Sequence, residues 1–477
     1  MHRSYALNKQ ERDAEMLQLS RREVLQSISC GFGFTAFAGL AAEVAQKEFQ
    51  SPLAPKQPHF AARAKRVIFL CMRGGPSHVD TFDYKPMLEE YSGKSPGEAS
   101  GGLNNQKGRK LKPSPWAFKQ HGESGLPISE LFPHVAKHAD DLCLLNGSHT
   151  TLPNHPQALV ELHTGNFQFV RPSVGAWMLY GLGTENQDLP GFITIKPPAR
   201  LGGAQNYGSA FLPAIYQGTP IGQTRQALKD ARVQNLNNPQ LTAKAQRQQI
   251  DLLQSLNRDL ADRQPDNSQI DGVIQSYELA FRMQSAVPKL LDLTNETEES
   301  LKLYGIGNGP TDDFGRQCLL ARRFVEAGVR YVELTHENWD QHKSLKARLG
   351  ANCKATDQPI AALLADLKRR DMLKDTLVIW GGEFGRTPAV RNDDGRDHNS
   401  AGFTMWMAGG GVKGGLRYGA TDDFGIAAVE DKFHTHDLHA TTLHLLGLDH
   451  TRLTYRYAGR DFRLTDVFGR VAEKIIA

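Results

Sequence analysis

The sequence predicts an α/β protein with a mostly parallel central sheet, helices on both faces of that sheet, and an added helical insertion. Short, continuously apolar runs recur along the chain, and several are followed by segments whose apolar residues have helical spacing. Runs without polar–apolar alternation are typical of strands buried on both faces, as in parallel sheets. Strands that alternate with helices favour this class over an all-β sandwich or a helix bundle.

Five apolar runs are the expected strands, and four periodic segments are the expected helices. Residues 91–125 are rich in Gly, Ser, Lys and Pro and predict a long exposed excursion, and residues 46–65 read as a linker. We expect residues 66–477 to form one α/β domain. The expected strands are 66–72, 142–145, 330–334, 376–380 and 403–408, and the expected helices are 156–163, 316–327, 357–370 and 436–446.

Residues 222–303 differ in character from the rest of this domain. They are rich in Gln, Asn, Leu, Asp and Arg, and Leu252, Leu253, Leu256 and Leu260 recur at helical spacing. The pattern predicts a helical insertion of about 222–303. It either covers the mouth of an active site or packs on an edge of the domain.

The first 45 residues resemble a twin-arginine signal peptide. Residues 20–26 read SRREVLQ, an apolar stretch runs from Ile28 to about Ala42, and small residues between Ala38 and Ala45 offer a cleavage site. The apolar stretch is too short to span a membrane. We therefore expect the twin-arginine export machinery as a partner, a periplasmic or extracellular location, and no stable membrane span in the mature protein.

Composition excludes several other classes of function. The chain has 477 residues, of which 40% are hydrophobic and 23% charged, and a formal net charge of +4. It carries no basic stripe interleaved with aromatic residues, so nucleic-acid binding is not expected. Its five cysteines form no C-x-x-C pair, so neither a disulfide framework nor a cysteine metal site is indicated.

Polar clusters follow the expected strands, and ligands of such sheets bind beyond the carboxyl ends of the strands. The first strand is followed by glycines and Asp80, and the second by a loop of hydroxyls and imidazoles before a helix. The third is followed by Asp340 and His342, which are close enough in an extended loop to share one cation. The fourth is followed by Glu383, a candidate ligand or base, and by Arg386, a candidate oxyanion clamp. A Gly-Arg-Asp-His-Asn segment that contains His398 comes next. The residues concerned are Asp80, Thr150, His155, Asp340, His342, Glu383, Arg386 and His398.

This mixture of imidazole and carboxylate groups favours a divalent metal. Zn²⁺ suits it best, whereas an all-oxygen set would suit Ca²⁺ or Mg²⁺, and Mn²⁺ is a further candidate. Metal ions at such a site polarise a phosphoryl or sulfuryl oxygen and activate water or another nucleophile. The alternative to a metal site is a set of loop residues whose hydrogen bonds only connect the strand ends.

Six motifs in order resemble a large exported family catalogued as domain of unknown function 1501, a branch of the alkaline-phosphatase/sulfatase-like superfamily. The resemblance covers roughly residues 60–470. It implies an alkaline-phosphatase-like fold with a metal site at the carboxyl edge of the sheet. The motifs are RGGPSHVDTFD, NHPQALVELHTG, WDQH, GGEFGRTP, GRDHN and THDLHATTLHLLGL.

The resemblance assigns roles to individual residues and also shows two departures. It implies metal ligation by Asp80, Asp340, His342, Glu383 and His398. Phe384 stands where the superfamily has a metal-binding histidine. His155 stands where sulfatases carry their nucleophilic cysteine, so no sulfatase signature is present. Thr150, Ser148, Thr151 or His155 itself then remains as a nucleophile, or metal-bound water attacks directly.

From these observations we expect an exported metal-dependent hydrolase-like protein that acts on phosphate or sulfate esters, either small molecules or polysaccharides. His155 or Thr150 would act near the attacking or leaving oxygen, and Arg386 would stabilise developing charge. The alternative function is a non-catalytic ligand- or polysaccharide-binding protein that keeps the fold with a degenerate site. A purely structural exported protein is a third reading, and it predicts no bound metal.

Overall fold

The structure is a computed structural model that describes residues 51–99, 108–231, 233, 236, 238, 240–264, 267–390 and 394–477. The expected signal peptide, residues 1–45, and the first part of the expected linker lie outside these residues. Within the described ranges, no helix has both the length and the apolarity that crossing a membrane requires.

A nine-stranded sheet forms the centre of the domain, and eight of its strands follow the order β14-β5-β13-β9-β1-β8-β6-β7. The ninth strand, β17, pairs with β5. The strands span Arg66–Met72 (β1), Leu142–His149 (β5), Phe192–Ile195 (β6), Thr219–Ile221 (β7), Tyr331–His336 (β8), Thr376–Gly381 (β9), Phe403–Ala408 (β13), Leu416–Tyr418 (β14) and Phe433–His434 (β17).

All of these strands run parallel except β13, which pairs antiparallel with both β9 and β5. β1 lies in the interior of the sheet, where Val67 pairs with Tyr331 on one side and with Leu377 on the other. Its continuous burial matches its apolar sequence, as expected for a strand covered on both faces. The predicted α/β class with a mostly parallel sheet is therefore confirmed.

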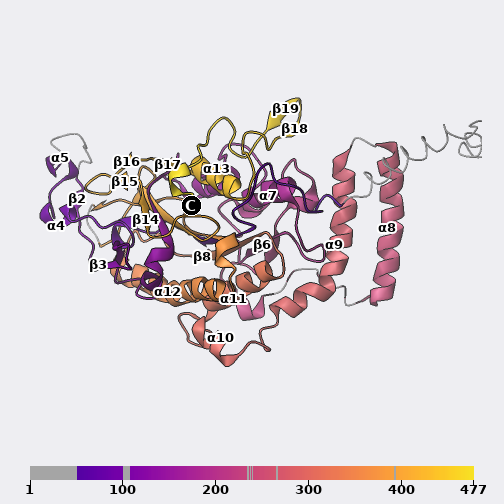
Figure 1. Cartoon of the computed structure of the whole chain (residues 1–477), viewed down its shortest axis with the longest axis horizontal. Coiled ribbons are helices and arrows are strands. Elements are labelled where there is room, and N and C mark those ends of the chain that lie inside the picture. Colours follow the sequence, from indigo (N-terminus) through magenta and orange to yellow (C-terminus); the bar gives the residue numbers. More distant parts are fainter. Residues whose placement is uncertain are drawn as a thin grey trace, which may run out of the picture. The chain divides into compact units, whose positions relative to one another are not determined.

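Helices cover both faces of the sheet (Figure 1). On one side lie α11 (Asp312–Glu326) and α12 (Leu345–Arg369), and on the other α7 (Val174–Leu182) and α13 (Thr435–Leu445). Helix α12 begins well before the expected start at residue 357. Leu345, Leu349 and Cys353 are spaced four residues apart and bury one face of the added turns.

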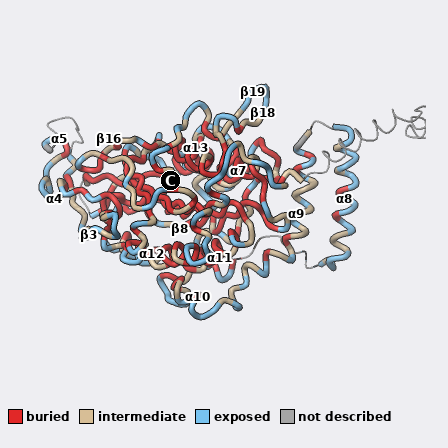
Figure 2. Tube along the Cα trace, viewed as in Figure 1, coloured by how far each residue is buried: buried red, intermediate tan, exposed pale blue. Residues whose placement is uncertain are grey.

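The region of the expected insertion contains α8 (Ala243–Arg263), α9 (Ser268–Leu291) and α10 (Glu298–Leu303). Helix α9 contacts α11 and the short turn Ala214–Tyr216 (η4), and α8 packs along α9. Of α8, only Ile250 and Gln254 are buried. Figure 2 shows this contrast, since buried residues concentrate in the sheet and its flanking helices while α8 is largely exposed.

The remaining elements are short, apart from the ten-residue helix α6. The described parts of residues 91–125 contain strands as well as loops, because β3 and β4 form a hairpin and β2 pairs with β11. These elements are α4 (Met87–Glu90), α5 (Pro96–Ala99), α6 (His155–Thr164), β2 (Lys110–Leu111), β3 (Phe118–His121), β4 (Leu126–Ser129), β10 (Gly385–Arg386), β11 (Ala389–Val390), β12 (His398–Asn399), β15 (Ala420–Thr421), β16 (Ala428–Glu430), β18 (Tyr455–Tyr457) and β19 (Arg460–Phe462).

Candidate metal centre

The carboxyl ends of β1, β5, β8 and β9 meet at one edge of the sheet, and the candidate site is built from the loops that follow them. Asp340 and His342 lie in the loop between β8 and α12, and His155 is the first residue of α6, after β5. His398 lies on β12, where it pairs in register with Arg386 of β10. Residues that are far apart in the sequence are thus brought together by the parallel arrangement of the strands.

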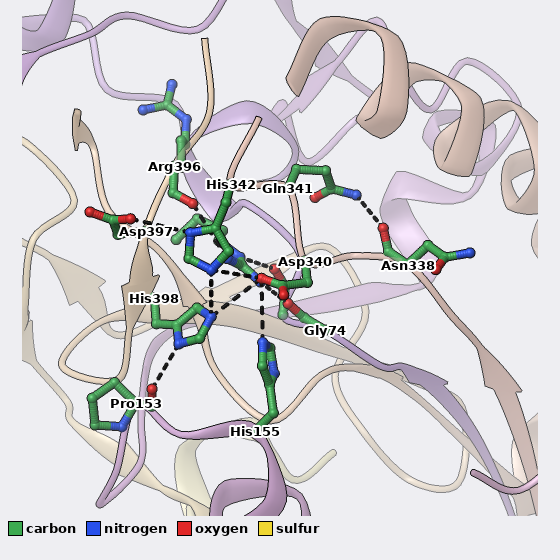
Figure 3. A network of polar contacts seen from close by, with 12 residues as sticks. Gly74, Pro153, His155, Asn338, Asp340, Gln341, His342, Arg396, Asp397 and His398 are labelled. Atoms are coloured by element: carbon green, nitrogen blue, oxygen red, sulfur yellow. Dashed lines mark hydrogen bonds and ion pairs between the residues drawn. The ribbon is translucent and has the colours of Figure 1, made fainter. Parts of the chain in front are cut away.

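Three imidazoles converge on one carboxylate oxygen (Figure 3). The Nε2 atoms of His155 and His398 each lie 3.3 Å from Asp340 Oδ1. His342 Nε2 lies 3.0 Å from the same oxygen and 2.9 Å from His398 Nε2. His155, Asp340 and His398 form the compact core of this group, with one donor atom from each within 4.8 Å of the others. We call these three residues and His342 the His–Asp cluster.

The opposite nitrogen of each ring is held by an oxygen atom. His155 Nδ1 lies 2.6 Å from Glu383 Oε1, and His398 Nδ1 lies 2.8 Å from the carbonyl oxygen of Pro153. His342 Nδ1 lies 3.2 Å from Asp397 Oδ1. Carbonyl and carboxylate oxygens accept hydrogen bonds, so each neutral ring carries its proton on Nδ1 and keeps a lone pair on Nε2.

This donor set fits a divalent metal such as Zn²⁺. Metal-binding histidines characteristically donate their other N–H group to a carboxylate or a backbone carbonyl, which fixes the tautomer and the ring orientation. His155 Nε2 is also buried without a hydrogen bond of its own. The side chains of Asp340 and His342 are 40% and 42% exposed, so the cluster is accessible from solvent.

The charges of the site favour a positive group at its centre. Burial alone would lower the pKa of His155, but the carboxylates of Asp340 and Glu383 raise it to about 9. Burial would raise the pKa of Asp340, yet His155, His398 and Arg386 together hold it far below its ordinary value. The cluster therefore attracts a proton, and a divalent cation can replace that proton.

Close backbone packing sets the position of the Asp340 loop. Gly74 has a φ of +117°, and a Cβ atom there would lie 2.6 Å from the backbone nitrogen of Asp340. A Cβ atom on Gly395 would lie 1.8 Å from the carbonyl oxygen of His342. Glycine is required at both positions because the backbone of Asp340 and of His342 lies directly against these residues.

Glu383 and Arg386 lie behind the His–Asp cluster and support it. Glu383 is buried and accepts hydrogen bonds from the Gly74 N–H group and from His155, so it orients this imidazole. Arg386 is fully buried and donates to the carbonyls of Gly74 and Gly75. Its guanidinium lies 2.6 Å from Asp340 Oδ1, so it faces that carboxylate rather than an open substrate position.

Asp80 and Thr150 lie away from the cluster. Both oxygens of the buried Asp80 carboxylate are bound by Arg396, at 2.6 and 3.0 Å, and Ser77 donates to one of them. Thr150 donates to Glu161 at 2.9 Å and accepts from Thr435 at 3.2 Å. The structure therefore gives Asp80 an ion-pair role and places Thr150 in a second polar group.

Two functional contacts were not predicted from the sequence. Asp397 orients His342, and its position directly before His398 was a signal that could have identified it. The Pro153 carbonyl orients His398, and a backbone acceptor of this kind has no sequence signal.

Comparisons with known proteins give a family and a set of similar structures. The family model described as "Protein of unknown function (DUF1501)" matches residues 64–476. No curated protein matches the chain at a significant level.

Similar solved structures include the PsFucS1 sulfatase from Pseudoalteromonas sp., with a TM-score of 0.34 and 12% identity over 81% of this chain and 68% of that chain. They also include the phosphonate monoester hydrolase SpPMH from Silicibacter pomeroyi, with a TM-score of 0.34 and 9% identity over 81% and 73%. A TAB5 alkaline phosphatase mutant has a TM-score of 0.31 and 11% identity over 74% and 92%.

Proposed function

Because the chain belongs to the DUF1501 family, whose description names no activity, we propose a function from its own side chains. The proposed function is that of a metal-dependent hydrolase of phosphate or sulfate esters. The observation that carries it is the convergence of three imidazole Nε2 atoms on Asp340 Oδ1, with each Nδ1 atom held by an oxygen. The ester class follows from the sequence motifs that resemble the alkaline-phosphatase-like superfamily.

The cluster divides into an inner set of ligands and an outer imidazole. His155, Asp340 and His398 would hold the metal, and three protein ligands leave a position open, as in catalytic zinc sites. When bound, a divalent cation supplies polarisation of an ester oxygen and acidification of water. His342 is the most exposed ring of the cluster and lies beside the inner set. It would accept or deliver a proton.

The attacking group is water in this proposal. Among the described residues, the polar contacts of the four cluster residues include no serine, threonine or cysteine side chain. Thr150, the hydroxyl residue expected at the site, is occupied by Glu161 and Thr435. The same observation favours a second function, in which the centre binds a ligand without turnover.

Activity measurements on purified, chelator-treated protein reloaded with Zn²⁺, Mn²⁺, Mg²⁺ or Ca²⁺ test the proposal. We expect hydrolysis of p-nitrophenyl phosphate or p-nitrophenyl sulfate with at least one metal. His398→Ala should lose both metal and activity. His342→Gln should keep the metal and lose turnover by about 10²- to 10⁴-fold, the usual contribution of a proton-transfer group.

His121→Asn is the matched control, because His121 lies in the β3–β4 hairpin and outside the His–Asp cluster. Stoichiometric metal without hydrolysis of either ester class would support ligand binding instead of catalysis. A wild-type protein that binds none of the four metals would contradict the hydrolase and leave ligand binding without a metal, or a purely structural role. We further propose that the protein acts in the periplasm or outside the cell, after twin-arginine export, which a reporter fused to residues 1–45 can test.

A further inference from the structure

A second group of ligand-type side chains lies at the same edge of the sheet, beside β5 and β17. Glu161 comes from the middle of α6, and His434 and His436 from the end of β17 and the start of α13. One donor atom from each of the three lies within 4.8 Å of the others. None of these residues belongs to the His–Asp cluster. All three line a cavity of about 750 Å³.

The two imidazoles face each other through their Nδ1 atoms. His436 Nε2 lies 2.8 Å from the carbonyl oxygen of Gly165, so it carries the proton and the neutral ring keeps its lone pair on Nδ1. His434 Nδ1 accepts the backbone N–H of His436 at 3.1 Å, which occupies its lone pair while no metal is bound, and His434 Nε2 lies 3.3 Å from the Thr151 hydroxyl. These two Nδ1 atoms are 3.0 Å apart. Two unprotonated nitrogens at this distance repel, and either a proton on one of them or a metal ion that displaces the cap contact of His434 relieves the repulsion.

Glu161 gives a second, independent indication of a missing positive charge. Its side chain is buried, with a residue exposure of 1%. The carboxylate accepts from the hydroxyls of Thr150 and Thr151, at 2.9 and 2.6 Å, and from the Thr151 amide. In the part of the chain that the structure describes, no lysine or arginine forms an ion pair with it. A buried carboxylate without a cationic partner is costly, and binding a cation relieves that cost.

We propose that Glu161, His434 and His436 form a second metal site that binds a divalent transition-metal ion. Two imidazoles and one carboxylate are the ligand set of several zinc enzymes, and three protein ligands leave a coordination position free. Because the three residues line the cavity, that position is accessible to water or to a small ligand. The threonine hydroxyls hold Glu161 in the orientation that the site needs, in the way that supporting groups orient other metal ligands.

Metal titration of the full-length, chelator-treated chain with Zn²⁺ and with Co²⁺ tests this site separately from the His–Asp cluster. Elemental mass spectrometry gives the stoichiometry, and the visible absorption of Co²⁺ reports the geometry of each site. The informative variants are His434→Ser and Glu161→Gln. Serine is a good helix N-cap and replaces the capping acceptor of His434 at the start of α13. Glutamine keeps the size of Glu161 and removes its charge.

We expect two metal ions per wild-type chain and one in each single variant, with the second-site affinity reduced at least tenfold. His398→Ala should lose the other ion, the double variant His398→Ala/His434→Ser should bind none, and His121→Asn should keep both.

If His434→Ser and Glu161→Gln retain wild-type stoichiometry and affinity, the proposal is overturned. It is also overturned if the wild type binds a single ion that His398→Ala removes, because a proton shared by His434 and His436 then suffices. If the Glu161 and His434 variants lose metal and His398→Ala does not, this site is supported and the His–Asp centre is contradicted.

Discussion

Glu383 binds Nδ1 of His155 and leaves Nε2 of that ring facing Asp340. Its buried carboxylate is the only group within hydrogen-bond distance of His155 Nδ1 among the described residues, at 2.6 Å. We predict that Glu383→Gln weakens Zn²⁺ binding about 10- to 100-fold, the usual cost of removing a group that orients a metal ligand. A competition titration with a chromophoric chelator measures this. Glu337→Gln, which removes a carboxylate paired with Arg73 in the loop after β8, is the matched control. Equal affinities in the two variants would contradict the role of Glu383.

Asp80 is predicted to contribute stability rather than a metal ligand. Its ion pair with Arg396 is fully buried on both sides. Removing one partner of such a pair leaves an uncompensated charge and costs about 3–5 kcal/mol. Asp80→Asn should therefore lower the free energy of unfolding by about this amount, measured by denaturant titration, while the folded protein keeps its wild-type metal content. Metal loss without a change in stability would instead restore Asp80 to the ligand set.

At the scale of elements, α6 serves three different polar groups. His155 at its first turn faces Asp340, Glu161 joins the His434–His436 pair, and His163 near its end pairs with Glu333 of β8. Glu161 lies six positions after His155, and His163 lies two positions after Glu161. Residues at these spacings lie on different sides of a helix, so one ten-residue helix can point these side chains in separate directions. The helix ends at Gly165, whose φ of +68° is a left-handed conformation and whose carbonyl orients His436.

The His163–Glu333 pair predicts a pH dependence of stability. His163 is buried, its Nε2 lies 3.0 Å from Glu333, and its Nδ1 lies 2.7 Å from the Leu159 carbonyl, so both nitrogens donate. Burial opposes the charge, but Glu333 raises the pKa of His163 above its ordinary value. A raised pKa stabilises the folded state below the unfolded value of about 6.5, and this stabilisation is lost as pH rises through the folded value.

We therefore expect the free energy of unfolding to fall less steeply above about pH 6.5 in His163→Gln than in the wild type. Denaturant titrations between pH 6 and pH 9 measure the two slopes. His121→Gln, in the β3–β4 hairpin, controls for the loss of a histidine as such. Parallel pH profiles for the wild type and His163→Gln would show that the pair does not titrate as argued.

At the scale of the whole molecule, the sequence predicted the layers of the fold better than the details of the site. The strand expected at 66–72 and the one at 403–408 have those bounds in the structure, because uninterrupted apolar runs bounded by turn residues mark buried strands. The antiparallel direction of β13 was not predicted, since a short apolar run carries no information on direction. Strand β6 and the edge strand β7 were missed because they are only four and three residues long.

The candidate site was predictable only in part, for a physical reason. Strand ends identify the loops that face a ligand, and this placed Asp340, His342 and His398 near one another. Sequence does not show which partner saturates a carboxylate. Asp80 follows β1 directly, as a ligand would, but the long reach of Arg396 from another loop binds both of its oxygens. The pairing of Glu383 with His155, 228 positions apart, has the same origin.

The assembly of the His–Asp cluster from distant segments makes a prediction for the whole chain. A metal that binds only the folded state stabilises it, by about 2.7 kcal/mol at a concentration 100-fold above the dissociation constant. The proposed ligands come from α6, the loop after β8, and β12, so unfolding of any of these segments would release the metal. We expect the melting temperature of the wild type to rise with added Zn²⁺ and to fall with a chelator. In His398→Ala the rise should be smaller, and in His121→Asn it should equal that of the wild type. Differential scanning calorimetry at fixed metal concentrations makes the comparison. Identical metal-dependent shifts in His398→Ala and the wild type would mean that the stabilising ion binds elsewhere than at His398.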